Sequence, residues 1–299
     1  MQKILLTGVN GQVGHALKSK LIQHEVFALN REQLDLTKLH DIKRVVREIK
    51  PNLIINPAAY TAVDKAETEP ELAYAINTTA AQILAEEAAR LNAALIHFST
   101  DYVYDGTKTA PYVENDEVNP VSIYGKTKLA GEDAIRSVGL PHLILRTSWV
   151  YGAYGKNFLN TILRLAAERD SLTIVGDQYG APTSSDSIAD AVVKLVNVWQ
   201  TAQQNQSGIV HFTNTESTSW HGFSCKIVNQ YNALLVSKGW PALKTKVENI
   251  AAISTTDYPT PAARPANSCL NNAKLKAVFG IELPPWQQGL QQVMQNLTR

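Results

Sequence analysis

Tyr124 and Lys128 are four positions apart in a segment whose apolar residues predict a helix over 124–138. At 3.6 residues per turn, the two side chains lie on one face of that helix. An ammonium beside a phenol favours the phenolate and lowers a phenol pKa that is ordinarily about 10. A phenol tuned in this way can act as a general acid or base. The spacing therefore predicts that Tyr124 transfers a proton with help from Lys128.

The alternative is that this pair is an ordinary feature of a helix, because tyrosine and lysine often occur at this spacing. The segment before it favours chemistry. The apolar run 94–98 predicts a buried strand and ends in Ser99-Thr100, which places hydroxyl groups at the end of that strand. We interpret the stretch from Ser99 to Lys128 as an active-site strand followed by a catalytic helix.

A glycine-rich turn lies near the amino terminus. Gly8, Gly11 and Gly14 follow a short predicted strand, 4–6, and precede a helix that runs to about residue 21. Glycine permits a tight turn and lets backbone amides approach a pyrophosphate at the positive end of a helix. Such a turn can be purely structural, but its place at the first strand–helix junction favours a bound dinucleotide.

The second predicted strand, 26–29, ends in Asn30-Arg31. An acidic residue here would bind the adenosine ribose hydroxyls of NADH, whereas an arginine suits the 2′-phosphate of NADPH. The sequence therefore predicts NADPH as the cofactor, with NADH possible. The alternative is that Arg31 is a solvated loop charge.

The order of predicted elements indicates an α/β fold. Further strands are expected at 53–55, 95–98, 143–146 and 209–212, with helices between them, including one over 38–50 capped by Thr37 and a long one after Pro70. Thr183 and Asp186 resemble a capping box that opens a helix to Trp199. We expect a Rossmann-type doubly wound parallel sheet with a smaller α+β substrate domain. Residues 1–150 would form the dinucleotide-binding domain, completed by segments within 171–213, and residues 151–299 would form mainly the substrate-binding domain.

Composition limits the other function classes. The 299 residues carry a formal net charge of +1 and a pI near 7.8, so there is no broad basic field for a nucleic acid. Two cysteines, Cys225 and Cys269, are too few for a disulfide framework or a metal cluster. No stretch approaches the length of a membrane span or a signal peptide. The expectation is a cytoplasmic protein without a membrane or nucleic-acid partner.

Several longer phrases resemble one enzyme family. They are Ala58 to Glu67, Ser99 to Tyr104, Tyr124 to Glu132, Arg146 to Tyr151 and Asp177 to Thr183. With the glycine turn, they are similar to the dTDP-4-dehydrorhamnose reductases, in the extended branch of the short-chain dehydrogenase/reductases. The resemblance extends from Gly8 to Ser268.

The resemblance implies NADPH-dependent reduction of the C4 keto group of a dTDP-4-keto-6-deoxy sugar, dTDP-4-dehydro-L-rhamnose. Thr100 would hydrogen-bond the carbonyl oxygen, Tyr124 would protonate the developing alkoxide, and Lys128 would hold the nicotinamide ribose. The implied substrate-binding residues are Thr100, Asp101, Tyr102, Trp149 and Arg264. The expected cofactor-binding residues are Gly8, Gly11, Gln12, Val13, Gly14, Asn30, Arg31, Asp35, Leu36, Ala58, Ala59, Tyr60, Thr61, Phe98, Tyr124 and Lys128.

The sequence departs from the family pattern in the first helix. Some members carry a glutamate there that helps to hold magnesium at a dimer interface, and here His15-Ala16 stands in that place, although Asp186 and Asp190 remain. We therefore predict no metal site and a monomer or weak homodimer. Trp149 could instead be a core aromatic and Arg264 a surface charge, and His211 is interpreted as a core residue.

Two other functions remain open. Another extended short-chain enzyme is one; an epimerase or a dehydratase is disfavoured because Asn30-Arg31 lacks the acid of an NAD site and Tyr102 stands where a dehydratase has glutamate. A non-catalytic relative, similar to the NADP-binding regulatory subunit of methionine adenosyltransferase, is the other. It is disfavoured because the catalytic set is complete.

Overall fold

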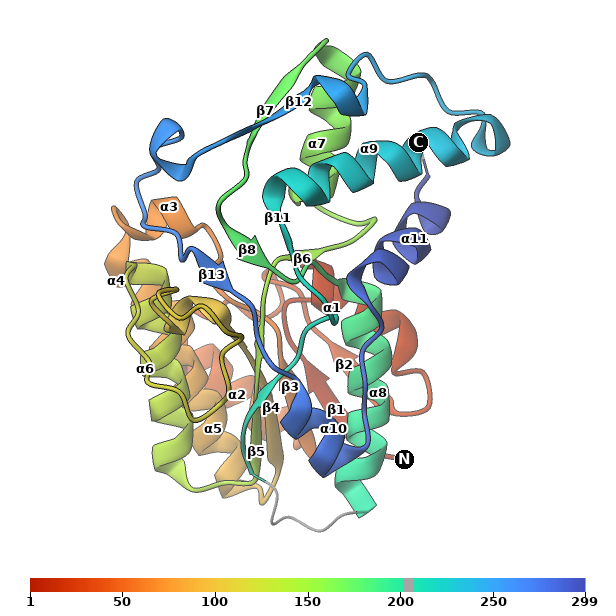
Figure 1. Ribbon diagram of the computed structural model, residues 1–299. Helices are drawn as coiled ribbons and strands as arrows, with labels where there is room; N and C mark the ends of the chain where they lie inside the picture. Colours follow the sequence, from red (N-terminus) through yellow and green to blue (C-terminus); the bar gives the residue numbers. More distant parts are fainter. Residues whose placement is uncertain (202–206, 299) are drawn as a thin grey trace.

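The computed structural model describes residues 1–201 and 207–298 (Figure 1). Its centre is a six-stranded sheet with the order β10-β5-β4-β3-β1-β2, in which every neighbouring pair is parallel. This confirms the predicted α/β fold with a parallel central sheet. The strands are β1 Lys3–Leu6, β2 Glu25–Ala28, β3 Leu53–Asn56, β4 Ala94–Thr100, β5 His142–Thr147 and β10 Gly208–His211.

Helices cover both faces of this sheet (Figure 1). Side chains alternate along a strand, so Ile4 and Leu6 of β1 pack on one face and Leu5 on the other. One face carries α1 Gln12–Lys20, α8 Ser185–Thr201 and α10 Ala273–Phe279. The other carries α2 Leu39–Ile49, α5 Ala80–Arg90 and α6 Ile123–Val138.

A smaller lobe stands above the carboxyl ends of the strands and has its own apolar core (Figure 1). Its helices are α7 Phe158–Glu168, α9 Trp220–Lys238 and α11 Trp286–Asn296. Its short strands are β6 Val150–Tyr151, β7 Leu172–Val175, β8 Tyr179–Gly180, β9 Thr183–Ser184, β11 Thr218–Ser219, β12 Ile250–Ile253 and β13 Asn267–Ser268. Strand β7 pairs with β12 in this lobe and lies outside the central sheet.

Two predicted helix caps are wrong. Helix α2 follows Lys38, and the hydroxyl of Thr37 donates to Asp35 instead of capping the helix. Thr183 lies in β9 and donates to the carbonyl of Ala181, so no capping box forms with Asp186. Both threonine hydroxyls instead form hydrogen bonds to nearby groups of the chain, as threonine often does in turns.

The long helix expected after Pro70 is divided. It consists of α4 Pro70–Tyr74, a π-helical turn η1 Ala75–Thr79, and α5. A π turn inside an α-helix places one residue out of register and is frequent at functional sites. Further short helices are α3 Val63–Ala66 and the 3₁₀ turns η2 Asp101–Val103, η3 Val247–Asn249 and η4 Thr255–Asp257.

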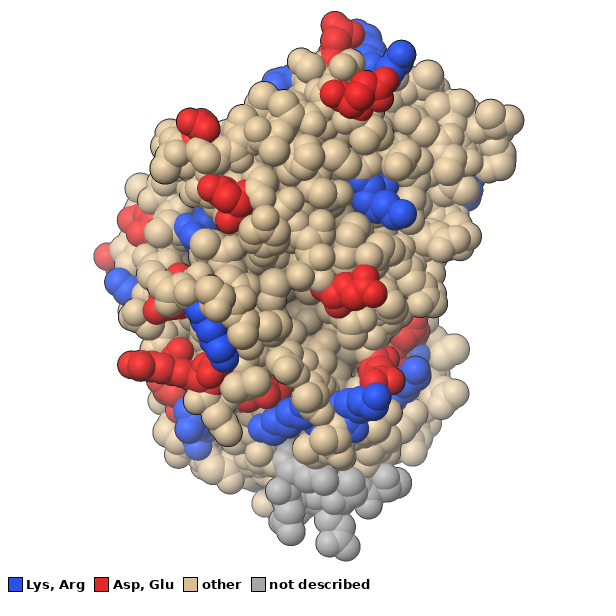
Figure 2. Space-filling model, viewed as in Figure 1, with Lys and Arg blue, Asp and Glu red and all other residues tan. Residues whose placement is uncertain are grey.

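Charges of both signs are interspersed on the face seen in Figure 2, in keeping with the net charge of +1. This distribution offers no single basic patch on that face. Within residues 1–201 and 207–298, no helix has the length and apolar character needed to cross a bilayer. Both cysteines are free thiols.

Candidate active site

The glycine turn after β1 has the close packing that its residues predict. Gly8 has φ +61°, a conformation that favours glycine, and a Cβ there would lie 2.9 Å from the Cα of Ala58. A Cβ on Gly14 would lie 2.3 Å from the carbonyl oxygen of Gly8. The turn and the first residues of α1 can therefore form only with glycine at these two positions.

A cavity of about 460 Å³ opens beside this turn, at the carboxyl ends of β1, β3, β4 and β5. Of the residues expected to bind the cofactor, all line the cavity except Asn30 and Tyr60. Asn30 is engaged in its own turn, where its side chain accepts from the amide of Gln33. The side-chain hydroxyl of Tyr60 donates to Glu69, away from the cavity.

The polar groups of this cavity fit a dinucleotide. The amide oxygen of Gln12 and the hydroxyl of Thr147 line it, are buried, and have no hydrogen-bond partner among the described residues. Unsatisfied buried polar atoms of this kind call for a ligand or water. Arg31 and Asp35 line the cavity with the glycine turn, and Tyr124 and Lys128 line it with the end of β4.

Helix α6 is held firmly at both ends. Ser122 caps it by accepting from the amide of Gly125 at 3.1 Å, and Glu67 accepts from the amide of Ile123 at 2.9 Å. Gly139, with φ +78°, ends it. The predicted helix 124–138 is therefore confirmed to within a residue, and Tyr124 lies in its first turn.

Asn77, in the π turn η1, joins this helix to the loop after β3. Its side chain accepts from the amide of Tyr60 at 2.8 Å and donates to the carbonyl of Tyr60 at 3.2 Å and to the hydroxyl of Thr127 at 3.0 Å. The residue is 1% exposed. The π turn thus places an amide where it fixes the cavity wall against α6.

The expected lowering of the Tyr124 pKa is wrong. Burial raises the pKa of Tyr124 to about 12, with hydrogen bonding to Thr100 opposing that rise. The Lys128 ammonium does not face the phenol, because its Nζ donates to the carbonyl of Phe98 at 2.7 Å and lies 3.1 Å from Nε2 of His97. Burial lowers the pKa of Lys128 to about 8.

The residues after β4 present a compact set of polar groups. The hydroxyl of Thr100 accepts from the amide of Tyr102 at 3.2 Å and donates to Asp101 at 3.1 Å. The second oxygen of Asp101 is buried and has no hydrogen-bond partner among the described residues. Burial raises the pKa of Asp101 to about 6. The ring of Tyr102 meets that of Tyr124 edge to face, with centroids 5.4 Å apart.

Trp149, at the end of β5, is held in a strained position. Its φ of +48° is rare for a bulky residue. Its ring stacks on Trp220 with centroids 3.5 Å apart and planes at 8°, and a Cβ on Gly180 would lie 2.5 Å from it. Strain of this kind persists only where neighbours impose it, and it is frequent at ligand sites.

Arg264 does not stand free at the surface. Its guanidinium donates to the carboxylate of Asp64 at 2.8 Å, and Asp64 also accepts from the amide of Ala262. Asp64 lies in α3, directly after the loop that lines the cavity. The pair therefore joins the carboxyl-terminal segment to the sheet domain beside the site.

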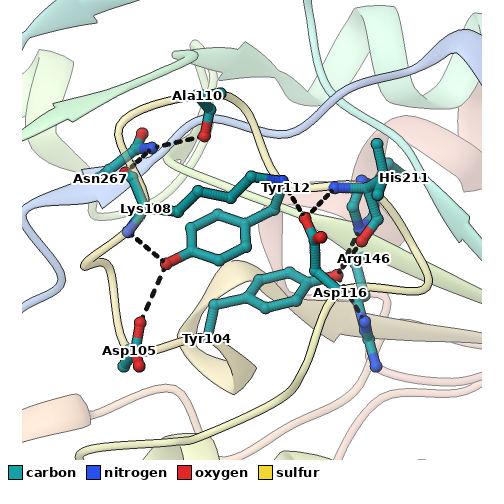
Figure 3. Close-up of polar contacts among 10 residues, drawn as sticks. Tyr104, Asp105, Lys108, Ala110, Tyr112, Asp116, Arg146, His211 and Asn267 are labelled. Atoms are coloured by element: carbon teal, nitrogen blue, oxygen red, sulfur yellow. Dashed lines mark hydrogen bonds and ion pairs between the residues drawn. The ribbon is translucent and has the colours of Figure 1, made fainter.

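Behind β4, a buried network supports the site (Figure 3). Arg146 donates to Glu132 of α6 at 3.0 and 2.6 Å and to the hydroxyl of Tyr104 at 2.7 Å. The Tyr104 hydroxyl lies 2.9 Å from Nε2 of His211, and burial together with the Arg146 charge lowers the pKa of His211 to about 3. His211 is thus a neutral core residue, as predicted. Ser99 donates to Glu132 from the cavity side.

The same network extends into the loop after Tyr104 (Figure 3). The ring of Tyr112 stacks on that of Tyr104, with centroids 4.2 Å apart, and its hydroxyl donates to Asp105 at 3.0 Å. Lys108 pairs with Asp116, and Asn267 of β13 donates to the carbonyl of Lys108 at 2.7 Å. This loop therefore links the active-site strand to the segment that carries Arg264.

The place of the family's magnesium bridge has other contacts here. His15 stacks on Tyr154 with centroids 3.9 Å apart, and Asp190 pairs with Lys20. Among residues 1–201 and 207–298, no cluster of three or more histidines, cysteines or acidic residues could hold a metal.

Sequence reasoning missed part of the cavity wall. The alternation of β4 signals Ser99, and the Gly-Lys pair in the loop after β6 is a recognisable signal for Lys156. The remaining missed residues include the polar Asn10 and Thr147, and they carry no comparable sequence signal. The missed lining residues are Asn10, Leu34, Pro57, Ile76, Ser99, Thr147, Val150, Gly155 and Lys156.

Comparison with known proteins gives a consistent result. The family described as RmlD substrate binding domain matches residues 1–299. A dTDP-4-dehydrorhamnose reductase of Burkholderia thailandensis is 45% identical over 292 residues, which cover 95% of each chain. Enzymes of the same name from Aggregatibacter actinomycetemcomitans and Escherichia coli are 42% and 39% identical, over 98% of this chain.

Solved structures agree. The crystal structure of a dTDP-4-dehydrorhamnose reductase from Bacillus anthracis in complex with NADP has a TM-score of 0.89 and 34% identity, and covers 99% of both chains. A UDP-glucose 4-epimerase from Thermus thermophilus in complex with NAD has a TM-score of 0.77 at 19% identity. The second likeness concerns the fold alone.

Proposed function

The chain belongs to the RmlD family of dTDP-4-dehydrorhamnose reductases, and from this premise we propose that it reduces the C4 keto group of dTDP-4-dehydro-L-rhamnose to give dTDP-L-rhamnose. NADPH is the reductant. The observation that carries the proposal is the convergence of Thr100, Tyr124 and Lys128 at the end of β4, where Tyr124 and Lys128 line a cavity that fits a dinucleotide.

NADPH, when bound, supplies the hydride, and the protein provides orientation and a proton. The Thr100 hydroxyl hydrogen-bonds the C4 carbonyl oxygen and orients it. Tyr124, whose pKa burial raises to about 12, is protonated at neutral pH and is ready to donate its proton to the alkoxide that forms. Lys128 keeps a positive charge in the wall of the same cavity, which favours an anion formed there.

Lys128 has one further task in this proposal. Two of its three ammonium protons have partners in His97 and the Phe98 carbonyl. The third is available for the nicotinamide ribose, because Lys128 lines the cavity. A fixed ammonium at this place both binds the cofactor and supports the proton donor.

The sugar site is proposed to lie between β4 and the upper lobe. Asp101, one oxygen of which has no hydrogen-bond partner among the described residues, can accept from a sugar hydroxyl. Tyr102 and the strained Trp149 provide apolar walls, which suit the faces of a deoxy sugar ring. Arg264, which is paired with Asp64, would also bind the diphosphate of the substrate.

The preference for NADPH rests on Arg31. It lines the cavity together with Asp35 and Leu36, and no acid stands at the end of β2. An arginine at this place binds a 2′-phosphate. The related enzyme of Bacillus anthracis was solved in complex with NADP, which supports the same preference.

The remaining expectations form part of the proposal. Residues 1–150 with β10 would bind the cofactor, and residues 151–299 would mainly bind the substrate. The two free cysteines suit a cytoplasmic protein. Sedimentation should show a monomer or a weak homodimer, since Asp190 is paired with Lys20 and no magnesium cluster lies within the described residues.

The decisive experiment uses the Tyr124→Phe variant. Oxidation of NADPH is followed by absorbance with and without dTDP-4-dehydro-L-rhamnose, and binding of NADPH is measured separately by fluorescence. We expect turnover to fall by about 10²-fold or more while NADPH still binds. Retained turnover would remove Tyr124 from the mechanism. If the wild-type protein binds NADPH but does not oxidise it when any sugar is added, the result would support the regulatory alternative.

A further inference from the structure

The ammonium of Lys128 rests on two groups of β4. Its Nζ lies 3.1 Å from Nε2 of His97 and 2.7 Å from the carbonyl oxygen of Phe98. Lys128 and His97 are each 1% exposed. Unlike Lys128, His97 is not among the residues that line the cavity. The imidazole therefore acts on the site only through the lysine.

The other nitrogen of His97 continues a buried polar chain. Its Nδ1 lies 3.1 Å from the side-chain amide of Asn56, and the far end of that amide is 2.6 Å from the hydroxyl of Thr7. Both of these residues are 1% exposed. A neutral imidazole carries one proton, so one of its nitrogens donates while the other accepts. The hydrogen bonds on the two sides of the ring must therefore point in the same direction along this series.

The charge of Lys128 fixes that direction. An ammonium cannot accept a hydrogen bond, so Nε2 of His97 must accept from it and the proton must lie on Nδ1. The amide of Asn56 would then have to present its oxygen to Nδ1, the reverse of the orientation in the structure. A neutral Lys128 amine has a lone pair, so Nε2–H can donate to it while Nδ1 accepts from the Asn56 nitrogen, which is the end of the amide that faces His97 in the structure.

His97 itself stays neutral in both arrangements. Its complete burial, and secondarily the charge of Lys128, hold its pKa well below the ordinary value. In a charged imidazole both nitrogens carry a proton, so neither could accept a hydrogen bond from the Lys128 ammonium. The ring can therefore change its tautomer without changing its charge.

The other ionisable groups around Lys128 leave it able to titrate. Burial lowers its pKa to about 8, and the carboxylate of Glu132, one turn further along α6, opposes that lowering. Glu132 is already paired with Arg146 from β5. Tyr124 precedes Lys128 by one turn, and Asp101 lies beyond Tyr124.

We propose that His97 is a positioning residue for the reduction: its Nε2 accepts from the Lys128 ammonium and holds it at the cavity, and the tautomer of the ring reverses when Lys128 loses its charge. The role of Lys128 in the reaction rests on the proposed function. The hydrogen bond between the two side chains does not. The pair can therefore be tested in the full chain without substrate.

The first measurement is NMR of protein labelled in histidine and lysine, between about pH 6 and pH 10, on either side of the Lys128 pKa. The nitrogen shifts of His97 should show the Nδ1–H tautomer at the lower pH and the Nε2–H tautomer at the higher. The pH midpoint of this tautomer change should equal the midpoint of the titration seen in the chemical shift of the Lys128 ε-carbon. An Nε2–H ring at the lower pH, or a tautomer that does not change with Lys128, would overturn the proposal.

Two variants test the same bond. His97→Phe keeps a ring but removes the acceptor, so the midpoint of Lys128 should fall by about one to two pH units. His97→Gln retains an acceptor oxygen and should restore part of that shift. The control is His142→Phe, because His142 is a buried histidine at the far end of β5 and should leave the Lys128 midpoint unchanged. Equal midpoints in His97→Phe and the wild type would overturn the proposal, and the wild-type tautomer decides the matter if His97→Phe does not fold.

The final arm separates this inference from the proposed function. The alkaline limb of kcat for NADPH oxidation should move in His97→Phe by the same number of pH units as the Lys128 midpoint. If the midpoint moves and kcat does not, the hydrogen bond stands, and the role of Lys128 in the proposed reduction is refuted.

Discussion

Removal of the Glu132 carboxylate should destabilise the protein strongly, because this group anchors helix α6, which carries Tyr124 and Lys128. Glu132 is 0% exposed and accepts from the guanidinium of Arg146 at 3.0 and 2.6 Å, and from the hydroxyl of Ser99. Arg146 is 2% exposed. In a Glu132→Leu variant, the guanidinium would keep its bond to Tyr104 at 2.7 Å, but its charge would remain buried without a counter-charge.

The size of the effect follows from that geometry. Loss of one partner from a buried ion pair costs about 3–5 kcal/mol. The unfolding free energy of a native protein is only about 5–15 kcal/mol, so the variant loses a large share of it. Urea denaturation followed by circular dichroism should show a midpoint lower by about 1 M or more, with an unchanged slope.

The matched control is Glu168→Leu in α7. Glu168 pairs with Arg164 at 2.8 Å, but the two side chains are 53% and 59% exposed, so the expected cost is a few tenths of a kcal/mol. A double variant, Glu132→Leu with Arg146→Met, should recover much of the loss because no buried charge remains. A loss below about 1 kcal/mol in Glu132→Leu, or one equal to that of the control, would refute the reasoning.

Two further predictions concern the cofactor and the sugar site. Arg31→Ala should raise KM for NADPH about tenfold or more, as expected for loss of a charge-assisted bond, and leave KM for NADH unchanged; equal effects on both cofactors in steady-state kinetics would contradict a 2′-phosphate contact. Burial raises the pKa of Asp101 to about 6 from 3.8, so its stabilising contribution is complete below about pH 4 and is lost as the pH rises through about 6. At about pH 8, Asp101→Asn should therefore have a higher unfolding free energy than the wild type, by up to about 3 kcal/mol, and a higher melting temperature. At about pH 4 it should show no such gain. A gain that is the same at both pH values in calorimetry would contradict this origin.

Much of the fold could be predicted from local pattern. The apolar runs of β1, β3, β4 and β5 are buried and continuous, as in a parallel sheet covered on both faces. The glycine turn was recognisable because Gly8 and Gly14 must be glycine for steric reasons that act within a few residues. The helix that carries Tyr124 and Lys128 was equally local, since one turn sets their shared face.

The missed features depend on contacts between distant segments. Asn77 stands in a π turn because it bonds to Tyr60 and Thr127, neither of which is close to it in the sequence. The pKa of Tyr124 rises because the fold buries the phenol, and spacing along one helix says nothing about burial. The strained Trp149 likewise depends on Trp220.

The packing of α6 against β4 is one contact between distant segments that the sequence pattern does indicate. Side chains alternate along β4, so Ile96 and Phe98 pack with α1 and α8, while His97 and Ser99 point to the opposite face. That face is covered by α6, whose inward positions recur every four residues and present Lys128 to His97 and Glu132 to Ser99. Each polar residue of the strand thus meets one of the helix. The helix that carries Tyr124, the proposed proton donor, is therefore anchored to the sheet by the same face, and a change in either register would displace both.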